Sequence, residues 1–493
     1  MQPGADSVDA GTVADASTTP VADASSEPSA DEKAAFAQFL DDVKTELDAT
    51  KTPGASVAIV LHGKLAFAAG VGTKGSAGGT STGDPVTTST RFNVASLSKM
   101  VLAATAMTLV DEGKLDLHAP ITKYLPWFKL ASGFDASTIT MHHLLSHTSG
   151  FPCDTVVLCG GGALSGPART WAEGSPQSLW AAPGAVFDYS NIGFSIASLV
   201  VASAAGVSDE AFGQVVQSRV FDRARMATAT YDAKLAEVGD YAIGAELNTE
   251  GVTTSWWKPT AFDCPLLSAP GGVRATATDY AHFAELLLAK GGGVLSESSA
   301  ALMMSSLVNM HTFDSRAYGY GLVYQEYPYG KNRPLVWHSG SLPGFLSEIF
   351  MVPEMGFAAI VLVNARGKNS VPDTIAAKAL PRFVADKQAW PASVKTPPST
   401  WDDYAGVYSD PYGDLGTVTV TIDVPDGGPK VVKVSAPKAT NTAGKLTPIE
   451  GSMTQGAGMD AWVLPNGEGV TFYRDGSGHV NRLVTRVGIA VRP

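Results

Sequence analysis

Apolar residues recur at helical spacing where the patterned part of the chain begins, and short apolar runs follow soon afterwards. The helical positions are Phe36, Phe39, Leu40, Val43 and Leu47. This spacing predicts an amphipathic helix over residues 31–49. Residues 55–61 and 64–69 form two short apolar runs separated by a two-residue turn signal, which predicts a hairpin. A second helical pattern covers residues 96–112 and stops at a glycine, a residue that commonly ends helices.

Strand signals return as a set far along the chain. They cover residues 335–337, 345–352 and 357–364, and a helical pattern follows over residues 372–387. The region between about 117 and 334 instead mixes short helical patterns with long loops rich in Pro and Gly. We expect strands from both chain ends to complete one antiparallel sheet flanked by helices, with the middle region inserted as a helical lobe. This is an α/β (α+β) architecture with a cleft between sheet and insertion.

A Pro-rich joint, residues 391–398, separates a final segment with a different pattern. Short strand signals follow at close spacing, over residues 404–408, 418–424, 431–435, 461–464, 470–473 and 483–491. Gly and Asp turns lie between them. This pattern predicts a small antiparallel β domain or barrel over residues 399–493.

Composition narrows the class of protein. The 493 residues are 45% hydrophobic and 17% charged, which is enough for a sizeable core. The formal net charge is -12 and the chain has no basic run, so nucleic-acid binding is disfavoured. The chain also lacks a run of about 18 apolar residues, so we expect no membrane span.

The first 30 residues are rich in Ala, Asp, Ser and Thr and contain no aromatic residue, Lys or Arg. Such a segment cannot bury enough apolar surface to offset its ordering entropy, which predicts a disordered tail over residues 1–30. Tails of this kind often follow the export signal of secreted proteins or lipoproteins. We therefore expect an exported protein, periplasmic or extracellular, either free or lipid-anchored, with a folded domain over residues 31–390.

The three cysteines are Cys153, Cys159 and Cys264. The first two could close a small surface disulfide, and the alternative is three unrelated small apolar residues. Neither a CxxC spacing nor a zinc-type Cys/His spacing occurs. His143 and His147 lie four residues apart, but no Glu follows His143 as in H-E-x-x-H. We expect no metal and no cofactor.

The chemistry is suggested by a Ser-x-x-Lys tetrapeptide at the start of the second predicted helix, Ser96 to Lys99. A serine hydroxyl is a weak nucleophile, so it needs a nearby base and donors for the oxyanion. Residues at i and i+3 share a helix face, so the amine meets the hydroxyl. The helix N-terminus also favours negative charge that develops at the serine.

The same spacing occurs at Ser255 and Ser435, so the tetrapeptide alone is weak evidence. The copy at Ser255 is followed by Pro259, and the copy at Ser435 contains Pro437 in a strand-rich region. Neither copy resembles a helix start. Only Ser96 keeps the required geometry.

Two further motifs follow in order. Tyr189-Ser190-Asn191 is the only Tyr-x-Asn of the chain, and His338-Ser339-Gly340 is its only [Lys/His]-[Ser/Thr]-Gly, on a predicted strand. With these three motifs, the sequence resembles the class C β-lactamase and D-alanyl-D-alanine carboxypeptidase superfamily. The resemblance extends to residues 144–150, 271–276, 318–321 and 338–345, and it covers about residues 31–387.

The resemblance implies a role for each motif residue. Ser96 would attack the substrate carbonyl and form an acyl-enzyme. Lys99 and Tyr189 would share the proton transfers, and either could be the base. Asn191 would hold Lys99 and the side-chain amide of the substrate. Read singly, Tyr189 fits an interface tyrosine and Asn191 a turn residue.

The third motif has its own implied roles. The backbone N–H groups of Ser96 and Ser341, the latter next to Gly340, would form the oxyanion hole. His338 would lie across the cleft, orient the substrate and tune Tyr189. His147 is better interpreted as fixing a loop by hydrogen bonding than as a chemical group.

The third motif departs from many β-lactamases, in which a lysine meets the carboxylate of the β-lactam. Here His338 replaces it, and a histidine is mostly neutral at pH 7. Strong β-lactamase activity is therefore disfavoured, and the motif looks more like that of carboxypeptidases, D-amino-acid peptidases and esterases.

Three functional hypotheses follow. The leading one is an acyl-serine hydrolase, an esterase or a peptidase that acts on D-amino-acid peptides, with a small ester, amide or peptide as substrate. A β-lactamase or penicillin-binding protein is the alternative. From another class, the chain could be a non-catalytic surface binding or assembly protein on a hydrolase scaffold. The last segment resembles the lipocalin-like appendage of some relatives, which shapes the cleft or promotes homo-oligomerisation. A passive stabilising role is its alternative.

Overall fold

The structure, a computed structural model, describes most of the chain. The described residues are 28–75, 83–131, 133–151, 168–174, 176–262, 265–310, 316–325, 333–367, 370–384, 398–410, 415–425, 428–439, 448–455, 460–464, 469–474, 477–485 and 488–492. The three cysteines, nearly all of the predicted tail and nearly all of the Pro-rich joint lie outside these ranges. The disulfide, the disorder of the tail and the domain boundaries therefore stay predictions.

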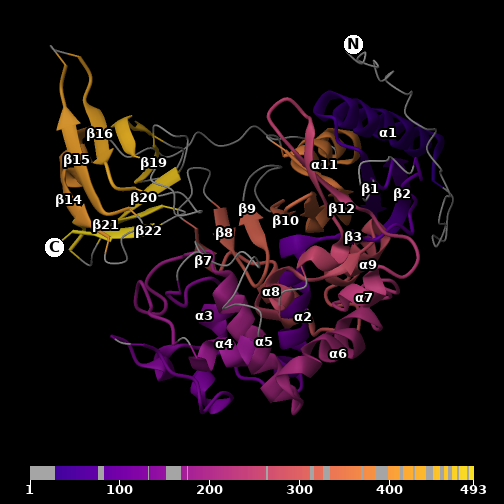
Figure 1. The fold of residues 1–493 in the computed structure, drawn as a ribbon, viewed down its shortest axis with the longest axis horizontal. Coiled ribbons are helices and arrows are strands. Elements are labelled where there is room, and N and C mark those ends of the chain that lie inside the picture. Colours follow the sequence, from indigo (N-terminus) through magenta and orange to yellow (C-terminus); the bar gives the residue numbers. More distant parts are fainter. Residues whose placement is uncertain are drawn as a thin grey trace, which may run out of the picture.

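An 8-stranded antiparallel sheet, called here the main sheet, forms the centre of the larger domain (Figure 1). In spatial order its strands are β2 (Lys64–Gly72), β1 (Gly54–Leu61), β12 (Phe357–Val363), β11 (Phe345–Val352), β10 (Leu335–Leu342), β9 (Val323–Gln325), β8 (Arg316–Tyr318) and β7 (Val308–Asn309). Strand β1 pairs with β12, and Val57 lies opposite Val361. The prediction that strands from both chain ends complete one sheet is confirmed.

Helices cover both faces of the main sheet, because its central strands are apolar on both sides. Ala58 and Val60 of β1 belong to one core cluster, whereas Val57 and Ile59 belong to the other. Helices α1 (Ala30–Thr50) and α11 (Val371–Phe383) pack on one face, and α2 (Ser98–Asp111) and α9 (Ala277–Leu288) lie on the other (Figure 1).

The first helix begins slightly earlier than predicted, for a local reason. Ser29 caps α1, because its hydroxyl accepts from the backbone N–H of Glu32, and the Glu32 carboxylate accepts from the N–H of Ser29. Such reciprocal capping satisfies two N–H groups that the helix leaves unpaired. Ala30, predicted to belong to the tail, is therefore the first residue of the helix.

The inserted region is a helical lobe, as predicted, with three small strand pairings. Its helices are α3 (Met141–Leu145), α4 (Ala168–Gly174), α5 (Asn191–Ala205), α6 (Phe212–Val216), α7 (Ala233–Ala236), α8 (Pro265–Gly271) and α10 (Glu297–Met303). Its small strands are β4 (Gly244–Leu247), β5 (Thr253–Trp257) and β6 (Arg274–Ala275). Strand β4 lies between β5 and β13 (Ala365–Arg366), and β6 pairs with β3 (Phe92–Asn93), so β3 and β13 join this region from outside it. Within the described ranges, no single helix is both long enough and apolar enough to cross a membrane. One pair of consecutive helical segments, Asn191–Ala205 and Asp209–Phe221, meets these two criteria when taken together, but the pair is bent by 98°.

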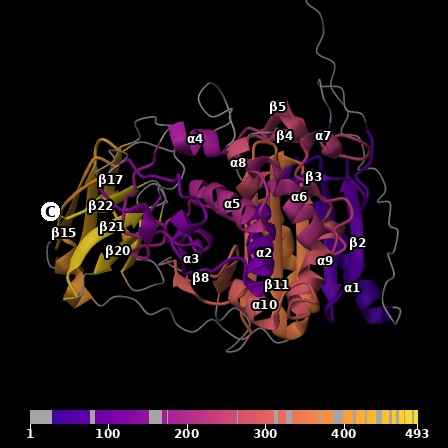
Figure 2. The same cartoon turned by 90° about the horizontal axis from the view of Figure 1, so that it is seen from below.

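A second, 9-stranded antiparallel sheet, called here the C-terminal sheet, curls at the end of the molecule opposite α1 (Figures 1 and 2). In spatial order its strands are β17 (Ile449–Ser452), β16 (Val431–Ala436), β15 (Thr417–Asp423), β14 (Gly406–Ser409), β22 (Gly488–Val491), β21 (Val480–Thr485), β20 (Gly469–Arg474), β19 (Ala461–Val463) and β18 (Thr454–Gln455). The predicted small β domain is confirmed. The prediction of one continuous strand over residues 483–491 is wrong, because these residues belong to two antiparallel strands, β21 and β22, in which Thr485 pairs with Gly488.

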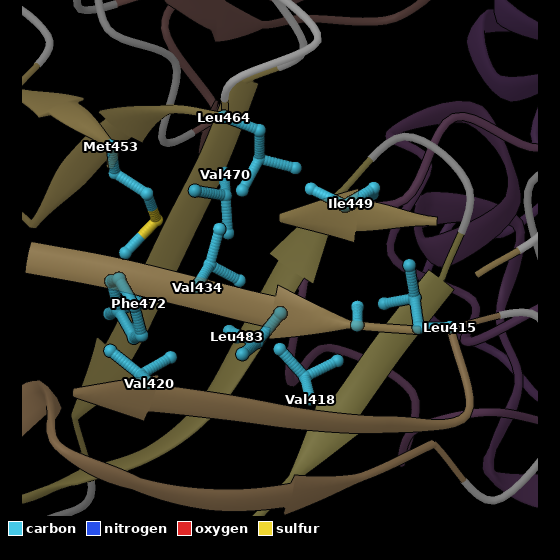
Figure 3. Close-up of a pocket in the computed structure, with 11 residues that line it drawn as sticks. Leu415, Val418, Val420, Val434, Ile449, Met453, Leu464, Val470, Phe472 and Leu483 are labelled. Atoms are coloured by element: carbon cyan, nitrogen blue, oxygen red, sulfur yellow. The ribbon is translucent and has the colours of Figure 1, made fainter. Parts of the chain in front are cut away.

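The interior of the C-terminal sheet is a packed apolar core. Figure 3 shows side chains from different strands, such as Val420 of β15, Val434 of β16 and Phe472 of β20, gathered in this interior. The cavity between them measures about 10 Å³, close to the smallest volume that holds one water molecule. The curled sheet therefore encloses a core rather than a ligand chamber.

Candidate active site

The segment that carries Ser96 joins a small strand to a buried helix. Strand β3 ends at Asn93, a 3-10 turn covers Ala95–Leu97, and α2 starts at Ser98. The prediction placed Ser96 in the first turn of the helix, whereas the structure places it in the tight turn just before. Its neighbours in this segment are buried and Ser96 is only half-buried, so its hydroxyl is positioned to reach a substrate.

The residue before Ser96 has an unusual backbone conformation. Ala95 has φ 50°, in the left-handed region that disfavours residues with a Cβ. Surrounding hydrogen bonds hold this turn. The Ser98 hydroxyl donates to the Ala95 carbonyl at 2.6 Å and accepts from the Val273 N–H at 3.0 Å. The Ser347 hydroxyl of β11 donates to the Val94 carbonyl at 2.7 Å. Strained backbone of this kind persists only where the surroundings over-determine it.

Gly340 of the third motif allows β10 to approach this turn closely. A Cβ at Gly340 would lie 2.4 Å from the Val94 carbonyl oxygen and 2.2 Å from the Ser347 hydroxyl. No other residue type fits such a spacing without a backbone shift. The strand that holds His338, Gly340 and Ser341 is thereby seated against the Ser96 turn.

Lys99 lies one turn after Ser96 and is fully buried, with 0% of its surface exposed. Its Nζ donates to the Ser96 hydroxyl at 3.0 Å, to Asn191 Oδ1 at 2.5 Å and to the Pro270 carbonyl at 3.1 Å. The same nitrogen lies 4.8 Å from the centre of the Tyr189 ring. The amine is therefore in contact with the hydroxyl that it would activate, and it is anchored by groups from two other helices.

Tyr189 and Asn191 flank the start of α5. Ser190 caps that helix, because its hydroxyl accepts from the Gly193 N–H at 3.1 Å. Asn191 is the first helical residue and directs its amide oxygen to Lys99. The structure thus brings Ser96, Lys99, Tyr189 and Asn191 together, although they come from separate parts of the chain.

His147 lies behind Tyr189 and is 1% exposed. Its Nδ1 accepts from the Ser190 N–H at 3.0 Å, and its ring centre is 4.2 Å from that of Tyr189. Burial lowers the pKa of His147 well below its usual value, and the charge of Lys99 adds to this effect. A neutral His147 therefore acts as a hydrogen-bonded support for the Tyr189 backbone, as the sequence interpretation expected.

His338 lies on β10 and is 3% exposed. Its Nδ1 is 2.7 Å from the Ser339 carbonyl, which can only accept, so we assign the proton to Nδ1. Its Nε2 then accepts from the Tyr318 hydroxyl at 3.0 Å. Burial, together with the charge of Lys99, lowers the pKa of His338 to about 3.

These contacts change the expected role of His338. Both of its ring nitrogens are engaged by protein groups, so neither is open for a direct hydrogen bond to a substrate. The ring centre of His338 lies 6.1 Å from that of Tyr189. His338 therefore contacts Tyr318 and the Ser339 carbonyl rather than an open part of the site, and its effect on Tyr189 stays a prediction.

Sequence reasoning missed several residues that build the site. Tyr318 had been noted only as part of a resembling segment, and its pairing with His338 depends on strands β8 and β10 lying in one sheet. Ser98, Ser347 and the Pro270 carbonyl carried no sequence signal for their roles. Ser341 lies on β10 next to Gly340, as expected. The two other Ser-x-x-Lys copies are not helix starts, since Ser255 lies in β5 and Ser435 in β16.

Within the described part of the chain, no group of three or more His, Cys, Asp or Glu side chains is arranged to hold a metal ion. His143 and His147 in particular make separate contacts. His143 Nδ1 accepts from the Thr140 N–H at 3.2 Å, whereas His147 faces Ser190.

Comparisons with known proteins identify the family. The family model described as Beta-lactamase matches residues 35–381. Penicillin-binding protein 4 of Amycolatopsis lactamdurans is 30% identical over 346 residues, which cover 68% of this chain and 85% of that protein. Unguisins hydrolase ungD' of Aspergillus campestris is 28% identical over 350 residues, 66% of this chain and 61% of the relative's length.

The fold also has close counterparts among solved structures. The octameric penicillin-binding protein homologue from Pyrococcus abyssi superimposes with a TM-score of 0.62 at 22% sequence identity. The alignment covers 93% of this chain and 100% of the homologue, so the likeness includes the C-terminal sheet as well as the main sheet. The family match, the 30% identical relative and the shared fold point the same way: the chain belongs to the Beta-lactamase family, the penicillin-binding-protein-related serine hydrolases.

Proposed function

We propose that this serine hydrolase forms an acyl-enzyme on Ser96, and that its acyl donors are either simple esters or D-amino-acid peptides. The observation that carries the proposal is the state of His338. It is neutral, its pKa lies at about 3, and both nitrogens are engaged. The third motif therefore offers no cation to a substrate carboxylate.

The proposed acylation follows from the contacts of Lys99. The pair of Lys99 and Tyr189, in the state that has lost one proton, takes the proton of Ser96 as Ser96 Oγ bonds to the acyl carbon. The bond to the leaving group then breaks, and the leaving alcohol or amine receives that proton. Water next attacks the acyl carbon and gives a proton to the same groups; the bond between the acyl carbon and Ser96 Oγ breaks, Oγ takes that proton, and the acid is released. Asn191 keeps Lys99 aligned throughout.

The Ser96 turn supports the same step. Its backbone is fixed by Ser98, Ser347 and the close approach of Gly340, so little reorganisation is needed when charge develops on the oxyanion. The backbone N–H groups of Ser96 and Ser341 are the proposed oxyanion donors.

A second candidate is β-lactam binding with slow release. It is favoured by the 30% identity to a penicillin-binding protein. The charge argument at His338 disfavours fast β-lactam turnover. Export of the protein and its assembly through the C-terminal sheet also stay proposals.

Intact-mass spectrometry after brief mixing with an aryl ester, a D-alanyl peptide or a chromogenic cephalosporin tests the function. We expect an acyl adduct on Ser96 with at least one of the first two donors, and no adduct in Ser96→Ala. Ser255→Ala is the matched control, because it removes the serine of another Ser-x-x-Lys copy, and it should acylate like the parent. If no donor labels the parent protein, a non-catalytic binding or assembly role replaces the proposal.

A matched substrate pair tests the charge argument. A D-alanyl-D-alanine peptide with a free carboxylate is compared with its C-terminal amide. We expect the amide to react at least as fast as the acid. A tenfold preference for the acid would contradict the inference from His338.

A further inference from the structure

One tyrosine of the C-terminal sheet points away from its own core. Side chains alternate along a strand, and in β20 Val470 and Phe472 point into the apolar interior (Figure 3). Tyr473 faces the opposite way. It packs against a buried cluster of the other domain, formed by Trp180, Ala181 and Val186.

Polar contacts of Tyr473 reinforce this docking. Its hydroxyl hydrogen-bonds the backbone of Phe187, and its surroundings include the carboxylate of Asp188. Arg482 on β21 lies opposite Tyr473 in the C-terminal sheet and is the charged group of that sheet near its hydroxyl. Burial raises the pKa of Tyr473, so its hydroxyl stays protonated at neutral pH. The contact thus combines an apolar patch with a specific hydrogen bond.

The contacted segment, residues 180–188, leads directly into Tyr189. It is attached by backbone hydrogen bonds to residues 147–150: Trp180 N–H to the Gly150 carbonyl at 2.7 Å, Gly184 N–H to the Thr148 carbonyl at 2.7 Å and Asp188 N–H to the His147 carbonyl at 2.8 Å. The Phe187 ring lies 5.6 Å from that of Tyr318. Tyr473 therefore contacts the backbone two residues from Tyr189, on a segment shared with the supports of the site.

We propose that Tyr473 is a positioning residue, through which the C-terminal sheet holds residues 180–188 and so keeps Tyr189 aligned with Lys99. This inference rests on the proposed function, since it assigns Tyr189 to proton transfer. It gives the C-terminal sheet a specific part in the reaction, in place of a passive stabilising one. In this proposal Tyr473 acts on the reacting groups only through its contacts with residues 180–188.

The test compares Tyr473→Ala, which removes packing and hydrogen bond, with Tyr473→Phe, which keeps the ring and loses only the hydroxyl. Val407→Ala is the control, because it truncates an exposed side chain of the same sheet, on β14. The acylation rate of Ser96 at saturating donor is measured across pH. We expect it to fall roughly 10- to 100-fold in Tyr473→Ala and a few-fold in Tyr473→Phe, with KM little changed. The control should match the parent.

Hydrogen–deuterium exchange supplies a readout that does not depend on turnover. Tyr473→Ala should speed exchange in residues 180–190 and leave α9 unchanged. The proposal would be overturned if Tyr473→Ala had the same acylation rate of Ser96 and the same exchange rate in residues 180–190 as the parent protein. If Tyr473→Ala fails to fold, Tyr473→Phe decides, and a parental rate and pH profile in that variant would also overturn it. If the parent protein is acylated by no donor, but exchange in residues 180–190 is faster in Tyr473→Ala than in the parent, the proposed function is wrong and the docking role of Tyr473 stands.

Discussion

The hydroxyl of Tyr318 lies 3.0 Å from Nε2 of His338, and both side chains are almost fully buried. Burial raises the pKa of Tyr318 and lowers that of His338. Tyr318 is therefore a donor and His338 a neutral acceptor at neutral pH. This pair fixes the tautomer of the histidine in the third motif.

Tyr318→Phe should lower the free energy of unfolding by about 1 to 3 kcal/mol, because it leaves a buried acceptor on His338 without its donor. Urea unfolding measures the loss. Tyr320→Phe is the matched control, since its hydroxyl lies 2.8 Å from Nδ1 of His142, away from the third motif. Both variants should lose stability, and only Tyr318→Phe should also slow acylation of Ser96. Parental stability in Tyr318→Phe would show that the hydrogen bond does not form.

Gly340→Ala should slow acylation of Ser96 by roughly 100-fold, because the new Cβ would push the Val94 backbone and displace the Ser96 turn. Stability should fall by about 1 to 3 kcal/mol. Gly174→Ala in α4 is the control, because a Cβ there meets nothing within 4 Å. Rapid-quench acylation combined with urea unfolding separates the two effects. An active, stable Gly340→Ala would mean that β10 and the turn are not in close contact.

Ala95→Gly should raise the free energy of unfolding by up to about 1 kcal/mol. The left-handed conformation costs an alanine about 1 to 2 kcal/mol, and glycine's extra freedom in the unfolded chain offsets part of the gain. At Ala37, an exposed position inside α1, the same change should instead cost about 1 kcal/mol. Opposite signs at the two sites are the expected result in thermal or urea unfolding. A loss of stability at both sites would show that Ala95 is not strained.

His142 makes the stability of the protein depend on pH. Burial lowers its pKa to about 4 in the folded state, against an ordinary value near 6.5 in the unfolded chain. The unfolded state therefore binds more protons between these values. The stabilising contribution is complete above pH 6.5 and is lost as the pH falls toward 4.

Urea unfolding of the parent and His142→Gln between pH 4.5 and 7.5 tests this linkage. The slope of stability against pH should be steeper in the parent by about 1 kcal/mol per pH unit near pH 5. Tyr320→Phe removes the partner hydroxyl but keeps the titrating ring, so it should retain the parental slope. Equal slopes in the parent and His142→Gln would rule out a lowered pKa at His142.

The fold was predictable where the pattern reflects burial. Strand β11 was predicted with its observed ends, because six of its eight residues are apolar and a short apolar run of this length indicates a buried strand. The apolar signal of strand β10 ends at Trp337, and only the third motif indicated that the strand continues; it extends to Leu342. Its inward positions there are His338 and Gly340, which are buried but lack an apolar signal.

The site was predictable at the residues whose chemistry is visible in their type and spacing. Ser96 and Lys99 are neighbours on the chain, and Asn191 was identified through its motif. The engagement of both nitrogens of His338 could not be predicted, because it requires Tyr318 from a strand that only the sheet order brings nearby. The contact of Tyr473 joins residues almost 300 positions apart, and nothing in either local pattern indicates it.

The pairing of β1 with β12 has a consequence for biosynthesis. Val57 and Val361 lie 304 positions apart, yet they are direct neighbours in the main sheet. Ribosomes add about 5 to 20 residues per second, so the apolar edge of β1 waits roughly 15 to 60 s for its partner strand. During that time it is a template for pairing with other chains. The edge of β1 must therefore stay protected from other chains until β12 has been synthesised. Slower synthesis between these two strands should favour aggregation over formation of the native sheet.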